Sequence, residues 1–140
     1  IMLDSVDLND LDFSRCNLSS ADFNRSDLAR TDFTSANLTE SILNGANLER
    51  SVLVNTQLQG ATCSGAIFSG ANLEGTNFRN ADLEFTNFEG SNLKGVDIVG
   101  ANIRFANFRG ADFGKGQSED WIKFMNQLSQ CPGYDTIQLH

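Results

Sequence analysis

The five-residue stretch Ala71-Asn72-Leu73-Glu74-Gly75 decides the fold, because its pattern returns thirty positions later as Ala101-Asn102-Ile103-Arg104-Phe105. Outward from these stretches, every fifth residue from Leu3 to Phe113 is Leu, Phe or Ile, with the single exception of Cys63. A fixed short period indicates a repeat architecture, in which each unit stacks on its neighbours. The period runs through 23 units, so one repeated unit accounts for most of the chain.

The apolar residues of each unit predict a chain that turns after every unit. We call the central Leu, Phe or Ile position i. Two inward residues, i−2 and i, separated by one polar residue make a strand-like alternation that lasts three residues. An ordinary helix would rotate this pattern around its surface, whereas a turn of about 90° per unit keeps both positions facing one axis. Position i−2 is nearly always small or apolar, and it is Ala at 21, 36, 46, 61, 66, 71, 81, 101, 106 and 111.

Glycine at position i+2 predicts the corners, because it tolerates the positive φ of tight turns. It is found at residues 45, 60, 65, 70, 75, 90, 95, 100 and 110. Four corners per coil give a coil of twenty residues, and residues 1–115 then make about 5.75 coils (115/20). Opposite charges at position i+1 recur at the same spacing, so we expect them on adjacent rungs, in the pairs Glu74 and Lys94, Glu84 and Arg104, and Glu89 and Arg109.

The same spacing predicts the interior of the coil. Rings twenty residues apart should stack in columns, with Phe68, Phe88 and Phe108 along one side and Phe13 and Phe33 along another. Burial of these centres at about 25 cal/mol per Å² would supply the main stabilisation.

Residues 116–140 leave the period and predict a C-terminal helix at about 118–129, followed by an irregular tail that starts at Cys131-Pro132-Gly133-Tyr134. Ser118 is the candidate N-cap, and the acidic Glu119 and Asp120 suit the positive end of the helix dipole. One side of this helix is apolar, with Trp121, Phe124, Met125 and Leu128 at i, i+3, i+4 and i+7. We expect this side to seal the last coil over Phe108 and Phe113, and a dimer-forming helix is the alternative. No lid precedes the first coil, so we expect upstream residues to cover it, or else end-to-end dimerisation.

Composition excludes several classes of function. The net charge of −8 disfavours nucleic acid and anionic membranes as direct partners. Three cysteines make an odd count without metal-ligand spacing, which predicts buried thiols at Cys16 and Cys63 and no disulfide framework or metal site. The only histidine is His140, and no nucleophile has a base nearby, so we expect neither catalysis nor a cofactor. The sequence does not decide the compartment; the cytoplasm is slightly favoured over the periplasm or a thylakoid lumen after leader cleavage.

Breaks in the outer pattern point to a candidate protein-contact surface. Position i−1 points outward and is Asp or Asn in most units, but not at Ile42, Val52, Gln57, Thr62 and Ile67. Val54 adds to this break, and two corners carry Phe85 and Phe105 one coil apart. An exposed apolar stripe tends to mark a contact surface. Alternatively, β-branched residues simply favour strands and the Phe rings cover glycine corners.

With these units the chain resembles the pentapeptide-repeat family over residues 1–115. The resemblance implies an all-β solenoid, a right-handed quadrilateral parallel β-helix, in a family that is abundant in cyanobacteria and mostly without assigned function. Some members are acidic rods that resemble DNA and bind DNA gyrase, a type II topoisomerase. In this chain the acidic residues are concentrated at the N-terminal end, because residues 1–40 carry eight acidic and three basic residues. A DNA-mimic function would depend on the stacked pairs Asp7 over Asp27 and Asp12 over Asp32.

The favoured interpretation is a non-catalytic scaffold that binds a protein partner on its outer surface, as a monomer or an end-to-end homodimer. Phe85, Phe105 and Ile67 are the first candidate contacts, followed by Ile42, Val52 and Val54. The DNA-mimic rod is the alternative.

Overall fold

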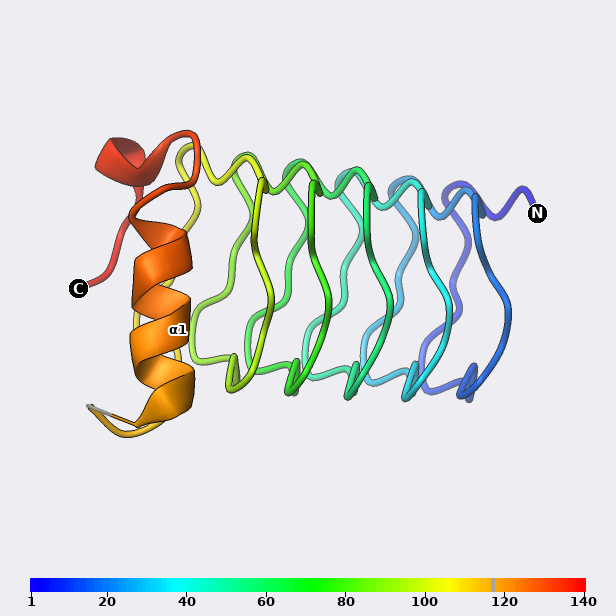
Figure 1. The fold of residues 1–140 in the computed structure, drawn as a ribbon. Helices are drawn as coiled ribbons and strands as arrows, with labels where there is room; N and C mark the ends of the chain where they lie inside the picture. The colour runs from blue at the N-terminus through cyan, green and yellow to red at the C-terminus, as the bar shows by residue number, and fades with distance from the viewer. Residues whose placement is uncertain (117) are drawn as a thin grey trace.

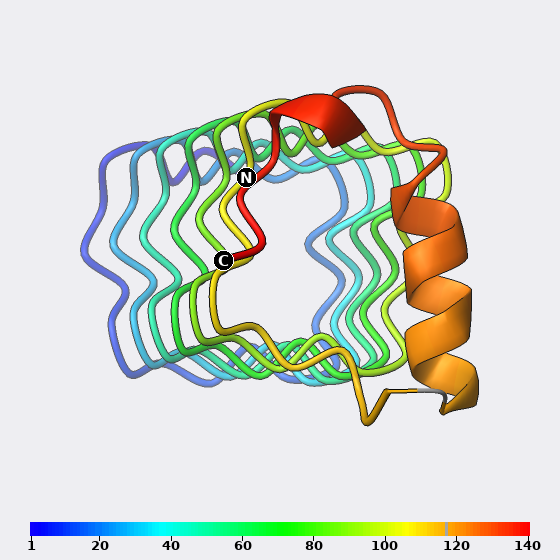
Figure 2. The ribbon, with the colours of Figure 1, turned by 90° about the vertical axis from the view of Figure 1, so that its left-hand side faces the viewer.

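The computed structural model describes residues 1–116 and 118–140, and it is a rod of stacked coils with the two termini at opposite ends (Figure 1). Each five-residue unit consists of three residues centred on a bridge residue, followed by a two-residue turn. Viewed along the axis, the coils superpose into a four-sided outline (Figure 2). Among the described residues the helices are α1 (Glu119–Leu128) and the short 3-10 helix η1 (Tyr134–Thr136), both at the C-terminal end.

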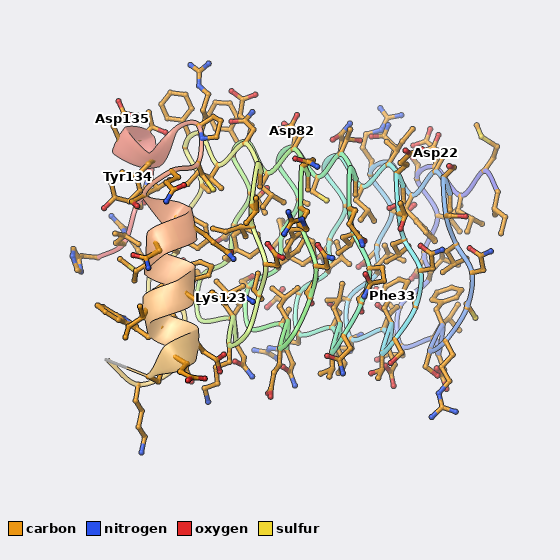
Figure 3. The ribbon with its side chains drawn as sticks, in the orientation of Figure 1. Asp22, Phe33, Asp82, Lys123, Tyr134 and Asp135 are labelled. Carbon is orange, nitrogen blue, oxygen red and sulfur yellow. The ribbon has the colours of Figure 1, made fainter. Side chains whose placement is uncertain are left out.

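A parallel ladder joins consecutive coils. Its bridges within the repeat join residues twenty positions apart, as between Asp22 and Ile42 or Asp82 and Asn102. This spacing confirms the predicted coil length. Each side contributes one bridge residue per coil, so the described residues form isolated bridges rather than extended strands. Figure 3 shows Asp22 and Asp82 on the same side of the rod, where the ladder links them through Ile42 and Thr62.

The corners have the left-handed backbone that glycine predicts. From residue 5 to residue 110 every position i+2 has a φ between 56° and 73°. The turn is closed by a hydrogen bond from the N–H of the next unit to the central carbonyl, as from Ala21 to Leu18 at 3.1 Å. Most corner residues other than glycine are polar, but Phe85 and Phe105 also adopt this conformation.

Aromatic columns fill the interior as predicted. The ring of Phe88 stacks on those of Phe68 and Phe108 with centroid distances of 5.3 and 5.1 Å. Phe13 and Phe33 stack at 5.3 Å in a second column. These spacings follow from the distance of about 4.8 Å between rungs.

The preference for Asp or Asn at position i−1 comes from hydrogen bonds at the outer surface. Within a unit the side-chain oxygen accepts from the backbone N–H two residues later, as from Arg104 N–H to Asn102 Oδ1 at 3.2 Å. Between coils the Asn102 amide donates to Asp82 Oδ1 at 3.1 Å. Where Thr62 replaces this residue type, Asn44 Oδ1 of the coil before accepts from the Ser64 N–H at 2.9 Å instead. These residues therefore order both the turn and the ladder.

One predicted thiol environment is wrong. Cys63 is fully buried, and burial raises the pKa of its thiol. Cys16, however, is exposed. It lies in the first coil, where inward-facing side chains have a coil on one side only, and Val6 and Leu11 at equivalent positions are also exposed.

All three predicted charge pairs lie on adjacent rungs, but among the described residues only one of them forms an ion pair. Arg104 lies 3.9 Å from Glu84 as expected, but Lys94 binds the Asp112 carboxylate at 3.1 Å rather than Glu74. Arg109 donates to the main-chain carbonyl of His140 at 2.8 Å rather than pairing with Glu89. The two glutamate carboxylates instead accept hydrogen bonds from asparagine amides: Asn92 donates to Glu74 and Asn107 donates to Glu89, each at 3.3 Å.

Helix α1 packs on the end of the column. Ser118 Oγ accepts from the Trp121 N–H at 3.2 Å, which confirms the predicted N-cap. The ring of Phe124 stacks on Phe113 at 4.7 Å and meets Phe108 edge-on at 6.2 Å. Phe124 and Leu128 are buried, whereas Trp121 and Met125 are partly buried. Gln117, which falls in the predicted C-terminal segment, is outside the described residues.

The tail after α1 consists mainly of turns, η1 and one bridge residue, and it pairs with the last coil, which the sequence did not predict. The Ile103 N–H donates to the carbonyl of Pro132 at 3.0 Å. Gln138 forms a parallel bridge with Asn107, and its carbonyl accepts from the Phe108 N–H at 2.7 Å. The tail therefore adds part of one further coil. It supplies hydrogen-bond partners for backbone groups of the last coil that would otherwise have none.

No helix in the described part of the chain combines the length and apolar character that crossing a membrane requires.

Candidate protein-contact surface

The most exposed aromatic feature of the rod is the pair Phe85 and Phe105, which we call the corner stack. The two residues occupy the same corner in consecutive coils, and their rings are nearly parallel, with centroids 5.0 Å apart and an interplanar angle of 16°. The residues are 58% and 42% exposed. The aromatic columns inside the rod are buried, whereas the corner stack faces solvent.

The fold does not need phenylalanine at this corner. Phe85 and Phe105 have φ values of 56° and 57°, in the left-handed region that costs a bulky residue energy. Glycine avoids that cost at nine other corners. The contact between two rings contributes about 0.5–1.5 kcal/mol, which offsets only part of the backbone strain and the exposure. Eleven other non-glycine corners share this backbone, so what distinguishes Phe85 and Phe105 is the exposure of large apolar rings, which tends to mark a contact surface.

Charged and polar groups surround one end of the corner stack. The Arg104 guanidinium lies 5.6 Å from the centre of the Phe105 ring, within the range of a cation–π contact. The same side chain lies 3.9 Å from the Glu84 carboxylate. Thr136 Oγ1, from η1, accepts from the Phe105 N–H at 2.7 Å. The C-terminal tail therefore holds the Phe105 end in place.

The other end of the corner stack is open. One coil before Phe85 the same corner is occupied by Gly65, where an added Cβ would meet no heavy atom within 4 Å. Ile67 lies two residues further on and is 38% exposed. The ladder pairs Ile67 with Asn87, which is two residues after Phe85. Ile67 therefore lies one coil before Phe85, on the side that follows the corner of the stack.

The structure places Val52 and Val54 away from this surface, whereas Ile42 lies two coils before Phe85 on the side that leads into its corner. Ile42 pairs with Asp22 and Thr62 on one side of the rod, whereas Val52 pairs with Asp32 and Asn72 on another. Ile42 is 37% exposed, and Val52 and Val54 are only partly exposed. These residues are close in sequence, but a twenty-residue coil distributes them around the rod.

The acidic residues form short columns at the N-terminal end. Asp7 pairs with Asp27 and Asp12 with Asp32, as the coil length predicts. Each column is only two carboxylates long, because Asn47 follows Asp27 and Val52 follows Asp32.

Arginines also offset part of the charge at this end. Arg25 lies 3.2 Å from Asp4, and Arg30 lies 2.7 Å from Asp10. Hydrogen bonding to Arg30 lowers the pKa of Asp10 from its ordinary value.

The structure also contains features that the sequence did not single out. Gly65 occupies the corner one coil before the corner stack and leaves it open, although it looks like any other corner glycine in the sequence. A groove of about 310 Å³ lies between α1 and the coil, lined by Val99, Gly100, Lys123, Asn126, Gln127 and Gln130. Across residues 1–116 and 118–140, no three His, Cys, Asp or Glu side chains gather as metal ligands would.

The family model for pentapeptide repeats matches the chain in eight copies, over residues 3–34, 31–62, 56–95 and 76–114. The chain therefore belongs to the pentapeptide repeat family. A search of curated proteins gave no match.

Solved structures of this family resemble the fold. The pentapeptide repeat protein Rfr23 from the cyanobacterium Cyanothece 51142 is 31% identical, with a TM-score of 0.60 over 69% of this chain and 83% of its own. HetL, involved in heterocyst differentiation regulation in the cyanobacterium Nostoc sp. strain PCC 7120, is 23% identical, with a TM-score of 0.40 over 88% of this chain and 68% of its own. QnrB1, a plasmid-mediated fluoroquinolone resistance protein, is 14% identical, with a TM-score of 0.46 over 82% of this chain and 65% of its own.

Proposed function

We propose that this chain is a non-catalytic scaffold that binds a protein partner on its outer surface, with the corner stack as the principal contact and Ile67 beside it. The observation that carries this proposal is the parallel, exposed pair of rings at a corner where the backbone favours glycine. Val52 and Val54 lie on another side, so they would serve a separate and weaker contact, whereas Ile42 flanks the same corner two coils before Phe85.

The filled interior supports a surface function rather than catalysis. Buried Leu, Phe, Ile and Ala side chains occupy the axis from residue 18 onwards. Enzymes need a concave site in which a substrate is largely enclosed. An outer face is therefore the surface on which this family member would act.

Finer features of the fold belong to the same proposal. The family resemblance implies that residues 1–115 form a right-handed β-helix, and their length corresponds to about 5.75 coils. The contacts of Phe124 with Phe108 and Phe113 support a capping role for α1, with Trp121, Met125 and Leu128 on the same side. An apolar column without a cap would expose a sheet edge that favours aggregation.

A DNA-mimic rod that binds DNA gyrase is the second candidate, and the stacked carboxylates of Asp7, Asp27, Asp12 and Asp32 favour it. A DNA-like stripe would follow the whole rod, whereas these columns end after two rungs. The residues from 41 to 70 carry one acid and one base, Glu49 and Arg50. The scaffold is therefore the better supported candidate.

Affinity capture from a lysate of the source organism tests both candidates. Wild type would be compared with Phe85→Ser/Phe105→Ser and with Asp7→Asn/Asp27→Asn. We expect a partner that is lost only with the aromatic change and that stays bound as salt is raised, because burial of apolar surface is not screened. Capture of a topoisomerase that is lost only with the aspartate change, and that weakens steeply with salt, would instead support DNA mimicry.

A further inference from the structure

We propose that the groove between α1 and the last coil binds the carboxylate group of a small organic ligand with a short apolar stem. We call this groove, of about 310 Å³ with Gly100 and Lys123 in its lining, the α1 groove. Its volume is at the lower end of the range for small-molecule sites, which favours a ligand of a few carbon atoms. It is separate from the corner stack, since Phe105 lies at the next corner along the chain.

The backbone N–H of Gly100 is an unused donor at the α1 groove. At earlier corners the equivalent N–H donates to a carbonyl of the following coil, as from Asn80 to Val99 at 2.9 Å. Gly100 belongs to the last coil, and α1 rather than another coil lies beyond it (Figure 2). No oxygen among the described residues accepts from the Gly100 N–H. The repeat therefore directs a donor toward α1 at a place where the acceptor is missing.

Side chains of the C-terminal segment supply such acceptors elsewhere on the last coil. Thr136 Oγ1 accepts from the Phe105 N–H at 2.7 Å. Gln127 Oε1 accepts from the Ile98 N–H at 2.9 Å. At Gly100 the chain itself provides no such oxygen, so a ligand oxygen would complete the pattern.

The other two corners of the last coil, Gly95 and Gly110, also have no accepting oxygen in the part of the chain that the structure describes. Neither of them lines the α1 groove. At Gly95, moreover, the Asp120 carboxylate lies 3.9 Å from the position of an added Cβ, so that corner already has an anion nearby. Gly100 is therefore the corner at which an unused donor and a lysine share one groove.

The ammonium group of Lys123 makes the missing acceptor an anion. No carboxylate of residues 1–116 or 118–140 lies within ion-pair distance of it. Asp97, two residues before Val99, is already engaged, because its carboxylate accepts from Arg79 at 3.0 Å and from the Val99 N–H at 3.1 Å. One uncompensated ammonium matches the single negative charge of a carboxylate better than the nearly double charge of a phosphate group.

The remaining lining of the α1 groove suits the rest of such a ligand. Since Gln127 Oε1 is engaged as an acceptor, the Nε2 end of this amide is left to donate. The side chains of Asn126 and Gln130 add two further amides to the lining. Val99 is 38% exposed, and it provides an apolar wall for the stem beside the carboxylate.

An NMR titration of the whole ¹⁵N-labelled chain at constant ionic strength tests the inference. The probe is butyrate, and butyramide is the neutral control of the same shape. We expect butyrate to cause saturable shifts at the amides of Gly100 and of the α1 residues that line the groove, and butyramide to cause none. Equal shifts with both ligands, shifts that do not saturate, or shifts spread over basic residues along the rod would overturn the inference.

Further ligands separate the possible sources of the carboxylate. The dipeptide acetyl-Ala-Val, with a free C-terminal carboxylate, is compared with butyrate and with its own C-terminal amide. Tighter binding of the dipeptide acid would identify a peptide C-terminus as the ligand, whereas binding of butyrate that is as tight or tighter would identify a free organic acid. Inorganic phosphate that binds more tightly than either acid, or a peptide amide that binds as well as the acid, would contradict a carboxylate site.

Matched variants locate the site on the chain. Lys123→Gln removes the cation from the α1 groove, and Lys115→Gln removes an exposed lysine outside the groove. We expect Lys123→Gln to weaken butyrate binding about threefold to fivefold, the range for an exposed ion pair, and Lys115→Gln to bind as wild type does. Equal affinities of Lys123→Gln and wild type would contradict the inference.

Two further variants complete the test. Asn126→Ala/Gln130→Ala changes only exposed residues of the groove, so it should weaken butyrate binding without lowering the melting temperature. Phe85→Ser/Phe105→Ser should bind butyrate as wild type does, because the corner stack is a separate surface. The carboxylate site and the proposed protein contact can therefore fail independently of each other.

Discussion

Single phenylalanine residues have opposite roles according to their position in the five-residue unit. Phe88 is 1% exposed in a column of rings, whereas Phe85 is 58% exposed at a corner. We expect Phe88→Ala to lower the free energy of unfolding by about 3–5 kcal/mol, as is usual for deletion of a buried ring. Phe85→Ser/Phe105→Ser removes only an exposed contact, so we expect a loss of no more than about 1.5 kcal/mol. Urea unfolding of both variants measures this difference, and a loss of several kcal/mol in the corner variant would make those rings structural.

The three cysteines should differ in reactivity. Burial raises the pKa of the Cys131 thiol to about 11 and raises that of Cys63 as well. The thiolate is the reactive form, so we expect only the exposed Cys16 to react with Ellman's reagent at pH 8 in the native protein. All three should react in denaturant. Reaction of a second thiol in the native state, at the rate of the first, would show that the surroundings of Cys63 or Cys131 open.

The sequence reveals the corner stack but only part of its surroundings. Phe85 and Phe105 are detectable because they replace glycine at a regular position. Gly65 has no distinguishing sequence signal, because its openness depends on which way the side chains of the neighbouring coils lean. Ile42 and Val52 are only ten residues apart in the sequence. Ten residues are half a coil, so the two side chains lie on different sides of the rod.

At the scale of elements, α1 and the tail end the rod by different means. The helix has an amphipathic pattern and a capping serine, so its position could be predicted from sequence. The pairing of Gln138 with Asn107 uses backbone groups, which every residue except proline provides in full. The tail therefore gave no sequence signal for its position on the last coil.

The burial of Phe124 predicts local opening at this end of the rod. Phe124→Ala removes the ring that contacts Phe108 and Phe113, whereas Ile122→Ala, on the same helix, changes a residue that is 46% exposed. In a stack where each coil contacts only its neighbours, the damage should remain local. We expect hydrogen exchange to accelerate at residues 98–113 with Phe124→Ala and to change little at residues 23–63. Ile122→Ala should resemble wild type, and uniform acceleration along the rod would contradict a capping role.

For the molecule as a whole, the periodic spacing was enough to predict the stacked coil, because every unit repeats the same inward and outward positions. The distribution of charge is less regular. Residues 1–40 carry a net charge of −5 and residues 41–70 a net charge of 0. Partner selection should therefore depend on individual breaks in the repeat rather than on the rod as a uniform surface.

Paired and hydrogen-bonded carboxylates along the rod also predict how its stability responds to acid. Hydrogen bonding lowers the pKa of Asp10 through Arg30, that of Asp12 through Ser14, and that of Asp112 through the Gly114 N–H and then Lys94, from an ordinary value of 3.8. A carboxyl whose folded pKa is lowered binds protons more readily in the unfolded chain. Its stabilising effect is therefore fully present above the ordinary value and is lost as the pH falls through the lowered one.

We expect the melting temperature to change little between pH 7 and pH 5 and to fall below about pH 4, where these carboxyl groups begin to bind protons. Melting curves of wild type and Asp112→Asn at pH 7, 5, 4 and 3 check this. Because asparagine keeps an acceptor for the Gly114 N–H but cannot be protonated in this range, the variant should lose less stability than wild type on acidification. A decline that is already complete at pH 5 would require a group other than these aspartates to control the acid response of the rod.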